Sequence, residues 1–496
     1  MRAWTLATAL TVILAAPAWA GAPVGGWVFD SSPDFPGFTR LVVAEKAGKV
    51  SGTITSTWYG DLPLTDPRVE GDTLIFKLYN GNPRVTMTDI VIAPEGKSVR
   101  MTGKVWYQDF AITAHKGSTT ELKSLDFPTY PLPDKRVVPQ KSLAPVPPMG
   151  WSSWNKFATD IDDTTIRQIA DALVSSGLRD AGYIYVNIDD GWQGKRDANG
   201  VLHPNEHFPD MKALADYVHA RGLKLGLYSG PGPKTCAGYE GSYGHVAQDA
   251  KTFAEWGVDY LKYDLCSGEA FYNTAETVYA NYQEMGEALN ATGRDIVYSL
   301  CQYGRFDVGA WGRDVGGHLW RTTGDIEDTY AKMSSIGFDK NGVPNHTGPN
   351  GWNDPDMLEV GNGGMTHDEY RTHMSLWALL AAPLILGNDV RDMTPETVAL
   401  LTNREVIAVD QDPLGAQGLP VKKDGAAEIW VKPLSDGKAV GLFNRGETPL
   451  TITGTWTELG ISGASVRDLW TGAETSAGDG FRYVIPPHGA ILVKVK

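Results

Sequence analysis

Residues 246–265, VAQDAKTFAEWGVDYLKYDL, contain an amphipathic, helix-like stretch followed by a short apolar run that is typical of a β-strand. The same combination recurs between residues 147 and 402, where we count about eight strand–helix repeats, the number that a (β/α)8 barrel needs. The helix after the fifth strand, near residues 306–312, has the weakest pattern. The expected strands lie within 149–155, 183–188, 223–229, 260–265, 296–301, 318–323, 352–358 and 383–388.

Regions of different character flank this barrel. Residues 21–122 alternate apolar and polar residues in short runs, such as VSGTITSTWYG at 50–60, which predicts an all-β domain. Residues 123–146 are rich in proline and are expected to form an extended linker. Residues 403–496 return to short strands and are expected to form an antiparallel β-sandwich. The predicted fold class is therefore multidomain α/β and β.

The first twenty residues have the features of a secretory signal peptide. Arg2 precedes an apolar run at 4–16, and Ala18-Trp19-Ala20 forms a small-x-small cleavage pattern. A membrane anchor is the alternative, but the run is shorter than the ~20 residues that a membrane span needs. We therefore expect an exported protein, periplasmic or extracellular, with no membrane span after cleavage.

Composition excludes several classes of function. The chain has 496 residues and a formal net charge of −15, which argues against binding to nucleic acid or to an anionic membrane surface. The ten histidines show no metal-binding spacing, and no phosphate- or dinucleotide-binding loop follows a strand. We expect no metal and no cofactor, and the sequence does not indicate an oligomeric state.

Acidic residues gather where the predicted barrel strands end. A single aspartate at such a place is usually a helix cap or a turn residue. Because active sites of these barrels lie at the carboxyl ends of the strands, acidic ends on five strands predict one shared pocket. These residues are Asp189, Asp190, Asp264, Asp325, Asp356 and Asp389.

The pattern favours the hydrolysis of glycosides. Two carboxylates that flank the bond are what this reaction needs. Lys262 lies two residues before Asp264, so both side chains face the same way on a strand, and the ammonium favours an ionised carboxylate. Four tryptophans near the same strand ends could stack on a sugar ring, although any one of them is more often a packing residue. They are Trp151, Trp192, Trp320 and Trp352.

Five motifs carry a resemblance to a known family. They are MGWSSWN at 149–155, NIDDGW at 187–192, KTCAGYEGSYG at 234–244, FAEWGVDYLKYDLC at 253–266 and NGWNDPDMLEVGNG at 350–363. In this order they resemble glycoside hydrolase family 27, which contains α-galactosidases and α-N-acetylgalactosaminidases. The resemblance covers residues 145–490 and leaves the N-terminal β region outside it, where a carbohydrate-binding role and simple packing are both open.

The resemblance implies a retaining mechanism in which Asp264 is the nucleophile and Asp325 the general acid/base, with carboxyl groups about 5–5.5 Å apart. It also implies that Asp189 and Asp190 bind the sugar hydroxyls O4 and O6. Lys262, Arg321 and Asp356 match further sugar ligands, and Trp151 matches an aromatic wall. Cys236 and Cys266 match a family disulfide, which would leave Cys301 free and buried.

Details of the motifs favour galactose as the sugar. Gln302 and Tyr303 occupy the loop that faces the sugar's 2-position, and their bulk leaves little room for an acetamide. Keeping both Asp189 and Asp190 favours a sugar with a C6 hydroxymethyl group. We therefore expect an exo-acting α-galactosidase on oligo- or polysaccharides with terminal α-galactose. A β-L-arabinopyranosidase and an α-N-acetylgalactosaminidase of the same family are the alternatives.

Overall fold

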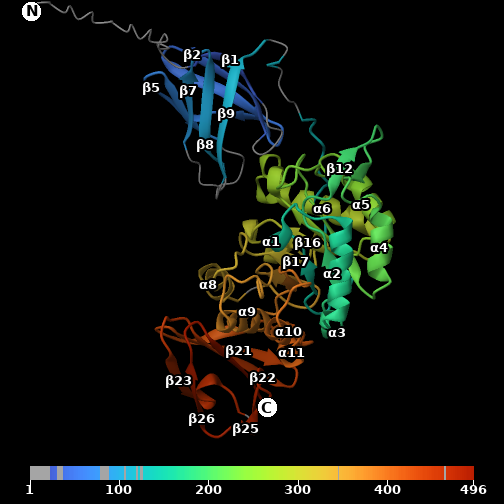
Figure 1. Ribbon diagram of the computed structural model, residues 1–496, viewed down its shortest axis with the longest axis vertical. Helices are drawn as coiled ribbons and strands as arrows, with labels where there is room; N and C mark the ends of the chain where they lie inside the picture. Colours follow the sequence, from blue (N-terminus) through green and yellow to red (C-terminus); the bar gives the residue numbers. More distant parts are fainter. Residues whose placement is uncertain are drawn as a thin grey trace, which may run out of the picture. The chain divides into compact units, whose positions relative to one another are not determined.

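The computed structural model describes residues 23–30, 37–78, 89–105, 108–118, 121–122, 127–344, 346–462 and 465–496. The predicted signal peptide, residues 1–20, lies outside this part of the chain. The chain divides into two compact units, one reaching to Thr129 with Glu269–Phe271 and one formed by Tyr130–Gly268 and Tyr272–Lys496 (Figure 1). Among the described residues, no helix combines the length and apolar character that crossing a membrane requires.

The first unit is built on one antiparallel sheet, as its alternating pattern predicts. Its nine strands lie in the order β4-β3-β2-β1-β9-β8-β7-β6-β5. One face carries fully buried side chains such as Trp27, Leu41 and Ile54, because successive residues of a strand point to opposite faces. The strands are β1 (Gly25–Phe29), β2 (Phe38–Lys46), β3 (Lys49–Ser56), β4 (Gly60–Pro63), β5 (Thr65–Glu70), β6 (Thr73–Lys77), β7 (Ile90–Glu95), β8 (Ser98–Val105) and β9 (Gln108–Lys116).

The second unit contains the predicted (β/α)8 barrel. Its eight strands are parallel and lie in the order β18-β17-β16-β15-β14-β11-β10-β19. A parallel bridge between Leu358 and Leu386 joins the two edges of this sheet. The fold class expected from the sequence is confirmed. The strands are β10 (Met149–Ser152), β11 (Tyr185–Asn187), β14 (Lys224–Ser229), β15 (Tyr260–Asp264), β16 (Val297–Cys301), β17 (Leu319–Arg321), β18 (Trp352–Asp354) and β19 (Leu384–Leu386).

Helices follow the barrel strands, and their sequences explain where they begin. The side chain of Asp162 accepts a hydrogen bond from the backbone N–H of Thr165 and caps α2, whose residues Ile166, Ile169 and Leu173 are buried on one face. The helices are α1 (Trp154–Phe157), α2 (Asp163–Ser175), α3 (Leu178–Ala181), α4 (Met211–His219), α5 (Val246–Trp256), α6 (Ala275–Ala291), α7 (Val308–Trp311), α8 (Tyr330–Ser334), α9 (His367–Leu380), α10 (Pro395–Leu401) and α11 (Arg404–Asp410).

Two details of the barrel depart from a regular repeat. The helix after β16 is only the four-residue α7, where the sequence pattern is weakest. The hairpin of β12 (Gln193–Arg196) and β13 (Leu202–Pro204) is inserted after β11. Helix α11 packs against α9, so the helical part of the barrel extends beyond the expected boundary at residue 402.

The described part of the proline-rich segment is extended, as its composition predicts, but from Tyr130 onward it is bound to the barrel. The Arg136 guanidinium pairs with Glu287 of α6 at 2.6 Å. The side-chain amide of Gln140 donates to the carbonyls of Gly317 and Asn350 at 2.6 and 2.5 Å. These contacts hold the segment against the barrel, so it is not a free linker.

Antiparallel strands form the C-terminal β-sandwich, in the sheet order β20-β21-β22-β27-β24-β25 and in the pair β23-β26. The Lys432 ammonium donates to the carbonyl of Ala378 at the end of α9, which joins the sandwich to the barrel. The strands are β20 (Leu419–Asp424), β21 (Ala427–Leu434), β22 (Gly437–Asn444), β23 (Leu450–Thr455), β24 (Ser465–Asp468), β25 (Glu474–Ser476), β26 (Gly480–Ile485) and β27 (Ala490–Val495).

Candidate active site

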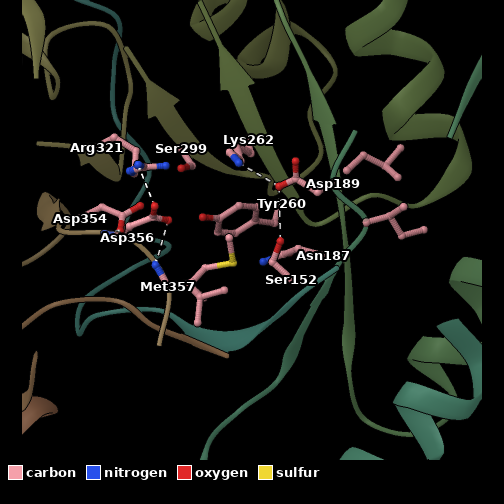
Figure 2. A pocket seen from close by; sticks show the side chains of 13 residues that line it. Ser152, Asn187, Asp189, Tyr260, Lys262, Ser299, Arg321, Asp354, Asp356 and Met357 are labelled. Carbon is pink, nitrogen blue, oxygen red and sulfur yellow. Dashed lines mark hydrogen bonds and ion pairs between the residues drawn. The ribbon is translucent and has the colours of Figure 1, made fainter. Parts of the chain in front are cut away.

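A polar cavity lies inside the barrel, toward the carboxyl ends of its strands. Figure 2 shows Lys262 and Asp189 on one side of the Tyr260 ring, and Arg321 with Asp354 and Asp356 on the other. Interiors of such barrels are usually filled with branched apolar side chains, so this concentration of charge indicates a binding site. The lining residues are Ser152, Asn187, Ile188, Asp189, Leu227, Tyr260, Lys262, Ser299, Arg321, Asp354, Asp356, Met357 and Ile385.

Lys262 is the cation on one side of the cavity. Its ammonium lies 2.8 Å from Asp189 Oδ2, and the hydroxyl of Ser152 donates to the same oxygen at 3.3 Å. Burial alone would lower the pKa of Lys262, but the negative charges of Asp189 and Asp264 outweigh it and hold the pKa well above its usual value. Lys262 is therefore charged at neutral pH, as the sequence led us to expect.

Arg321 is the cation on the other side. Its guanidinium pairs with Asp356 Oδ2 at 2.8 Å and with Asp325 Oδ1 at 3.0 Å. The backbone N–H groups of Ile326 and Met357 donate to Asp356, whose φ of +88° places it in the left-handed region. Such strained backbone conformations cluster at functional sites, because the surrounding contacts must hold them.

Asp264 ends β15 on the same face as Lys262 and is 5% exposed. The Tyr303 hydroxyl donates to its Oδ1 at 2.6 Å. Burial raises the pKa of Asp264 to about 6, although the charge of Lys262 and the hydrogen bond from Tyr303 oppose this rise. The charge of Asp325 also raises this pKa, so the two carboxylates act on each other.

Asp325 differs from Asp264 in its surroundings. Its side chain is 69% exposed, beside the fully buried Arg321 guanidinium. Desolvation raises the pKa of Asp325, but the positive charges of Arg321 and Lys262 outweigh it, so the pKa lies below its usual value. The environments of Asp264 and Asp325 thus push their pKa values apart, and the higher pKa belongs to Asp264.

Asp190 is held beside the same strand ends. The backbone N–H of Ala237 donates to its Oδ2 at 2.7 Å, and burial raises its pKa to about 7. Its other oxygen is one of several buried polar atoms near the barrel mouth that have no hydrogen-bond partner within the described chain. These atoms are Asn187 Oδ1, Asp190 Oδ1, Gln302 Oε1, Arg321 Nε and Asn388 Oδ1.

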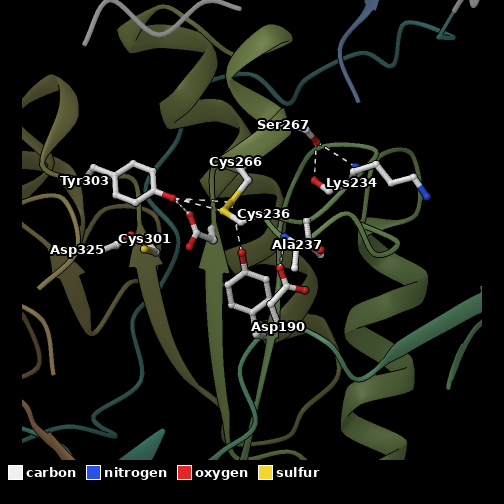
Figure 3. Close-up of a disulfide and its surroundings, with 12 residues drawn as sticks. Asp190, Lys234, Cys236, Ala237, Cys266, Ser267, Cys301, Tyr303 and Asp325 are labelled. Atoms are coloured by element: carbon white, nitrogen blue, oxygen red, sulfur yellow. Dashed lines mark hydrogen bonds between the residues drawn. A yellow bond between two sulfur atoms is a disulfide. The ribbon is translucent and has the colours of Figure 1, made fainter. Parts of the chain in front are cut away.

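A disulfide joins Cys236 and Cys266, whose Cα atoms are 5.1 Å apart (Figure 3). This is the pairing that the resemblance implies. It links the loop after β14 to the end of β15, next to Asp264. Cys301 is free and buried, and its sulfur accepts from Arg321 Nη1 at 3.8 Å. Cys236, Cys266 and Asp264 form a compact group of potential metal ligands, but disulfide sulfurs carry no thiolate, so the group does not fit a metal.

The four tryptophans that could stack on a sugar are packing residues here, which is the more common role for any one of them. All four are fully buried. Trp151 donates its indole N–H to the carbonyl of Asn388 and packs edge-on against Phe157, with ring centres 6.0 Å apart. The aromatic wall implied at Trp151 is therefore not seen, because its ring is buried against Phe157 and is not part of the cavity lining. The Gln302 amide is also turned away, toward the carbonyl of Arg321 at 3.4 Å.

Sequence reasoning missed several side chains of the site. Ser299 lines the cavity from β16, and Asp354 lines it from β18. Asn187 and Asp354 are the last residues of β11 and β18, and both lie inside motifs quoted from the sequence. The rule that barrel sites lie at the carboxyl ends of strands would have found these two.

Comparison with known proteins gives the family. Residues 146–412 match the family described as Alpha galactosidase A, and residues 424–495 match its C-terminal β-sandwich domain. The chain belongs to the α-galactosidase family. Alpha-galactosidase 3 of Arabidopsis thaliana is 52% identical over 66% of this chain and 76% of its own length. The chain is therefore a glycoside hydrolase.

Two solved structures resemble this chain over different shares of its length. A putative α-galactosidase from Bacteroides fragilis covers 95% of this chain and 98% of its own, with 32% identity and a TM-score of 0.67. An α-galactosidase from Saccharomyces cerevisiae, solved with raffinose, covers 71% of this chain and 98% of its own, with 28% identity and a TM-score of 0.66. The yeast protein therefore matches little more than two thirds of this chain, although nearly all of the yeast protein is matched.

Proposed function

We propose that this protein removes terminal α-D-galactosyl residues from oligo- or polysaccharides by double displacement, with Asp264 as nucleophile and Asp325 as acid/base. The observation that carries the proposal is the charged cavity at the carboxyl ends of the barrel strands, where Lys262 and Arg321 each pair with a carboxylate. Carboxylates, an ammonium and a guanidinium around one cavity are hydrogen-bond partners for a ligand with many hydroxyl groups. The balance of charges around the cavity suits a neutral sugar, since Lys262 and Arg321 already pair with carboxylates.

Positions of the charged side chains suggest how the sugar is held. Asp189 and Asp190 offer carboxylate oxygens that accept hydrogen bonds from sugar hydroxyls, and Lys262 and Arg321 offer donors. Asp356 shares Arg321 with Asp325, so a sugar bound between them would be fixed relative to the acid/base. This arrangement would bring the anomeric carbon toward Asp264.

The reaction has two steps. First, a carboxylate oxygen of Asp264 forms a bond to the anomeric carbon, while the glycosidic oxygen leaves and takes a proton from Asp325. Next, Asp325 removes a proton from water, which attacks the anomeric carbon and releases Asp264. Two inversions keep the α configuration. Asp325 is ionised in the open site, and a substrate that covers its exposed side chain raises its pKa, which favours the protonated acid.

Azide, added as an external nucleophile, tests the proposed roles of Asp264 and Asp325 separately. We expect Asp264→Gly to lose turnover of p-nitrophenyl α-galactoside and, with azide added, to form β-galactosyl azide, because azide attacks once from the face that Asp264 leaves open. Asp325→Gly with azide should form α-galactosyl azide, because the galactosyl-enzyme still forms first. The product anomers are read by NMR.

A rim carboxylate provides the control. The sequence pattern placed Asp389 in the shared pocket, but it lies outside the cavity lining and pairs with Arg391 at the end of β19, so Asp389→Gly should keep normal turnover. The roles would be overturned if Asp264→Gly kept normal activity, or if both azide products had the same configuration. Wild-type protein that cleaves only the α-N-acetylgalactosaminide or the β-L-arabinopyranoside would instead favour one of the alternative sugars.

Two further points belong to this proposal. The relative solved with raffinose suggests raffinose-type oligosaccharides as substrates to try first. We also propose that the protein is exported, which the sequence of residues 1–20 and the disulfide both support, because disulfides persist in oxidising compartments.

A further inference from the structure

The hydroxyl of Tyr303 lies between the proposed nucleophile and the disulfide (Figure 3). It is 2.6 Å from Asp264 Oδ1, 3.6 Å from the sulfur of Cys236 and 3.7 Å from the sulfur of Cys266. None of the sugar contacts proposed above uses this hydroxyl. The hydroxyl is therefore in direct contact with the carboxylate that is proposed to react.

Of the three atoms named around this hydroxyl, the Asp264 carboxylate oxygen is the strong acceptor. Disulfide sulfurs carry no proton and accept only weakly, whereas a carboxylate is a strong acceptor at 2.6 Å. Burial and the charge of Asp264 hold the pKa of Tyr303 well above its usual value, so the hydroxyl keeps its proton and donates. The two sulfurs then limit where the hydroxyl can move.

Backbone geometry of the loop after β16 supports a dedicated placement. Tyr303 has a φ of +62°, in the left-handed region that non-glycine residues rarely adopt. Gly304 follows with a φ of +75°, and a Cβ there would collide with the carbonyl of Thr322. Strand register places Cys301 directly beside Asp264, so a tight turn within two residues is needed to bring Tyr303 back over that carboxylate.

We infer that Tyr303 is a positioning residue that holds Oδ1 of Asp264 and stabilises this carboxylate when it is released from the galactosyl-enzyme. The inference rests on the proposed function. With Oδ1 held, Oδ2 forms the bond to the anomeric carbon. In the second step that bond breaks, its electron pair returns to Asp264, and the Tyr303 hydrogen bond strengthens as the negative charge returns.

Loss of the Tyr303 hydroxyl should slow the second chemical step, and this effect is visible in kcat and KM. A hydrogen bond to a charged group corresponds to about a ten- to hundredfold effect on a rate. With a dinitrophenyl α-galactoside the first step is fast, so release of the sugar limits kcat. In Tyr303→Phe we therefore expect kcat to fall by about this factor and KM to fall with it, because the galactosyl-enzyme accumulates.

The pH profile provides a readout that a structural role would not move. Loss of the donor removes an interaction that favours the ionised form of Asp264, so the limb of the profile governed by this carboxyl should move to higher pH in Tyr303→Phe. Tyr282→Phe is the matched control. The Tyr282 hydroxyl is buried and donates to the carbonyls of Tyr263 and Cys301, not to Asp264, so both limbs should stay in place.

A variant of nearly the same shape as tyrosine separates the effect of the hydrogen bond from an effect on folding. Replacing Tyr303 by 3-fluorotyrosine keeps the ring and makes the hydroxyl a stronger donor, so the same limb should move to lower pH. An unchanged kcat and unchanged limbs in both Tyr303 variants would overturn the inference. If wild-type protein released no galactose, the proposed function would fail, whereas active wild type with unresponsive Tyr303 variants would remove only the inference.

Discussion

At the scale of single residues, two carboxylates of the same chemical type acquire different properties from their neighbours. Asp264 is buried, and its pKa is raised to about 6. Asp325 is exposed, and the nearby Arg321 and Lys262 lower its pKa. The buried Arg321 guanidinium pairs with Asp325 and also with Asp356. It therefore affects both the position and the proton affinity of Asp325, the proposed acid/base.

These pKa directions predict the pH dependence of activity. The reactive state has Asp264 ionised and the single proton on Asp325. It is one of the two singly protonated forms of this interacting pair, which exist mainly between the two macroscopic pKa values. Below the lower value both are protonated, and above the upper value, about 6, both are ionised. We expect a bell-shaped kcat/KM for p-nitrophenyl α-galactoside with its maximum on the acidic side of about pH 6. A maximum in alkaline solution would contradict these environments.

At the scale of elements, the loops that follow neighbouring strands depend on one another. Asp264 ends β15, Tyr303 follows β16, and Cys236 lies in the loop after β14. The disulfide and the Tyr303 hydrogen bond connect these three loops across the barrel mouth. Asp264, the proposed nucleophile, is therefore flanked by the loops that follow both neighbouring strands as well as held by its own strand.

The disulfide should contribute measurable stability. Cys236 and Cys266 are 30 residues apart, and closing a loop of this length contributes about 3–4 kcal/mol in the chain-entropy model. We expect Cys236→Ser/Cys266→Ser to lower the free energy of unfolding of the barrel by this amount, measured by denaturant titration with tryptophan fluorescence. Each single variant should lose nearly as much as the double, because either one breaks the bond. Equal stability of wild type and double variant would contradict this prediction.

At the scale of the whole molecule, the site belongs to the second unit. Every residue in the cavity lining lies between Ser152 and Ile385. Helix α9 is buried on nearly all sides, from Tyr370 to Leu380, and it packs against β21, β22 and β27 of the sandwich. The barrel and the sandwich therefore share one core, whereas the nine-stranded sheet has a core of its own.

This division predicts the outcome of two truncations. A chain that begins at Tyr130 should fold and keep kcat/KM for p-nitrophenyl α-galactoside within about twofold, an effect well under 1 kcal/mol. The yeast relative, which matches 71% of this chain over 98% of its own length, supports this expectation. A chain that ends at Asp412 should aggregate, because it exposes the buried face of α9. Loss of activity in the chain that begins at Tyr130 would contradict an independent second unit. A stable chain that ends at Asp412 would contradict a core shared by barrel and sandwich.

Much of this architecture could be predicted from local pattern. The eight barrel strands follow from alternating strand-like and helix-like segments, and the acids after them follow from the rule that barrel sites lie at strand ends. The two-residue period placed Lys262 and Asp264 on one face. It could not show that Trp151 is fully buried, because an aromatic residue at a strand end serves packing and ligand stacking with the same local sequence.

The sequence by itself determined which residues end each strand, and with them the family, the barrel and the pair of carboxylates. Only the tertiary structure decided which charges meet. Arg321 pairs with Asp356 across two strands, and Tyr303 donates to Asp264 from the next loop, although 39 residues separate them in the chain. A pKa depends on desolvation and on charges a few ångströms away, and both are properties of the folded chain. The proton affinities of the site therefore come from folding.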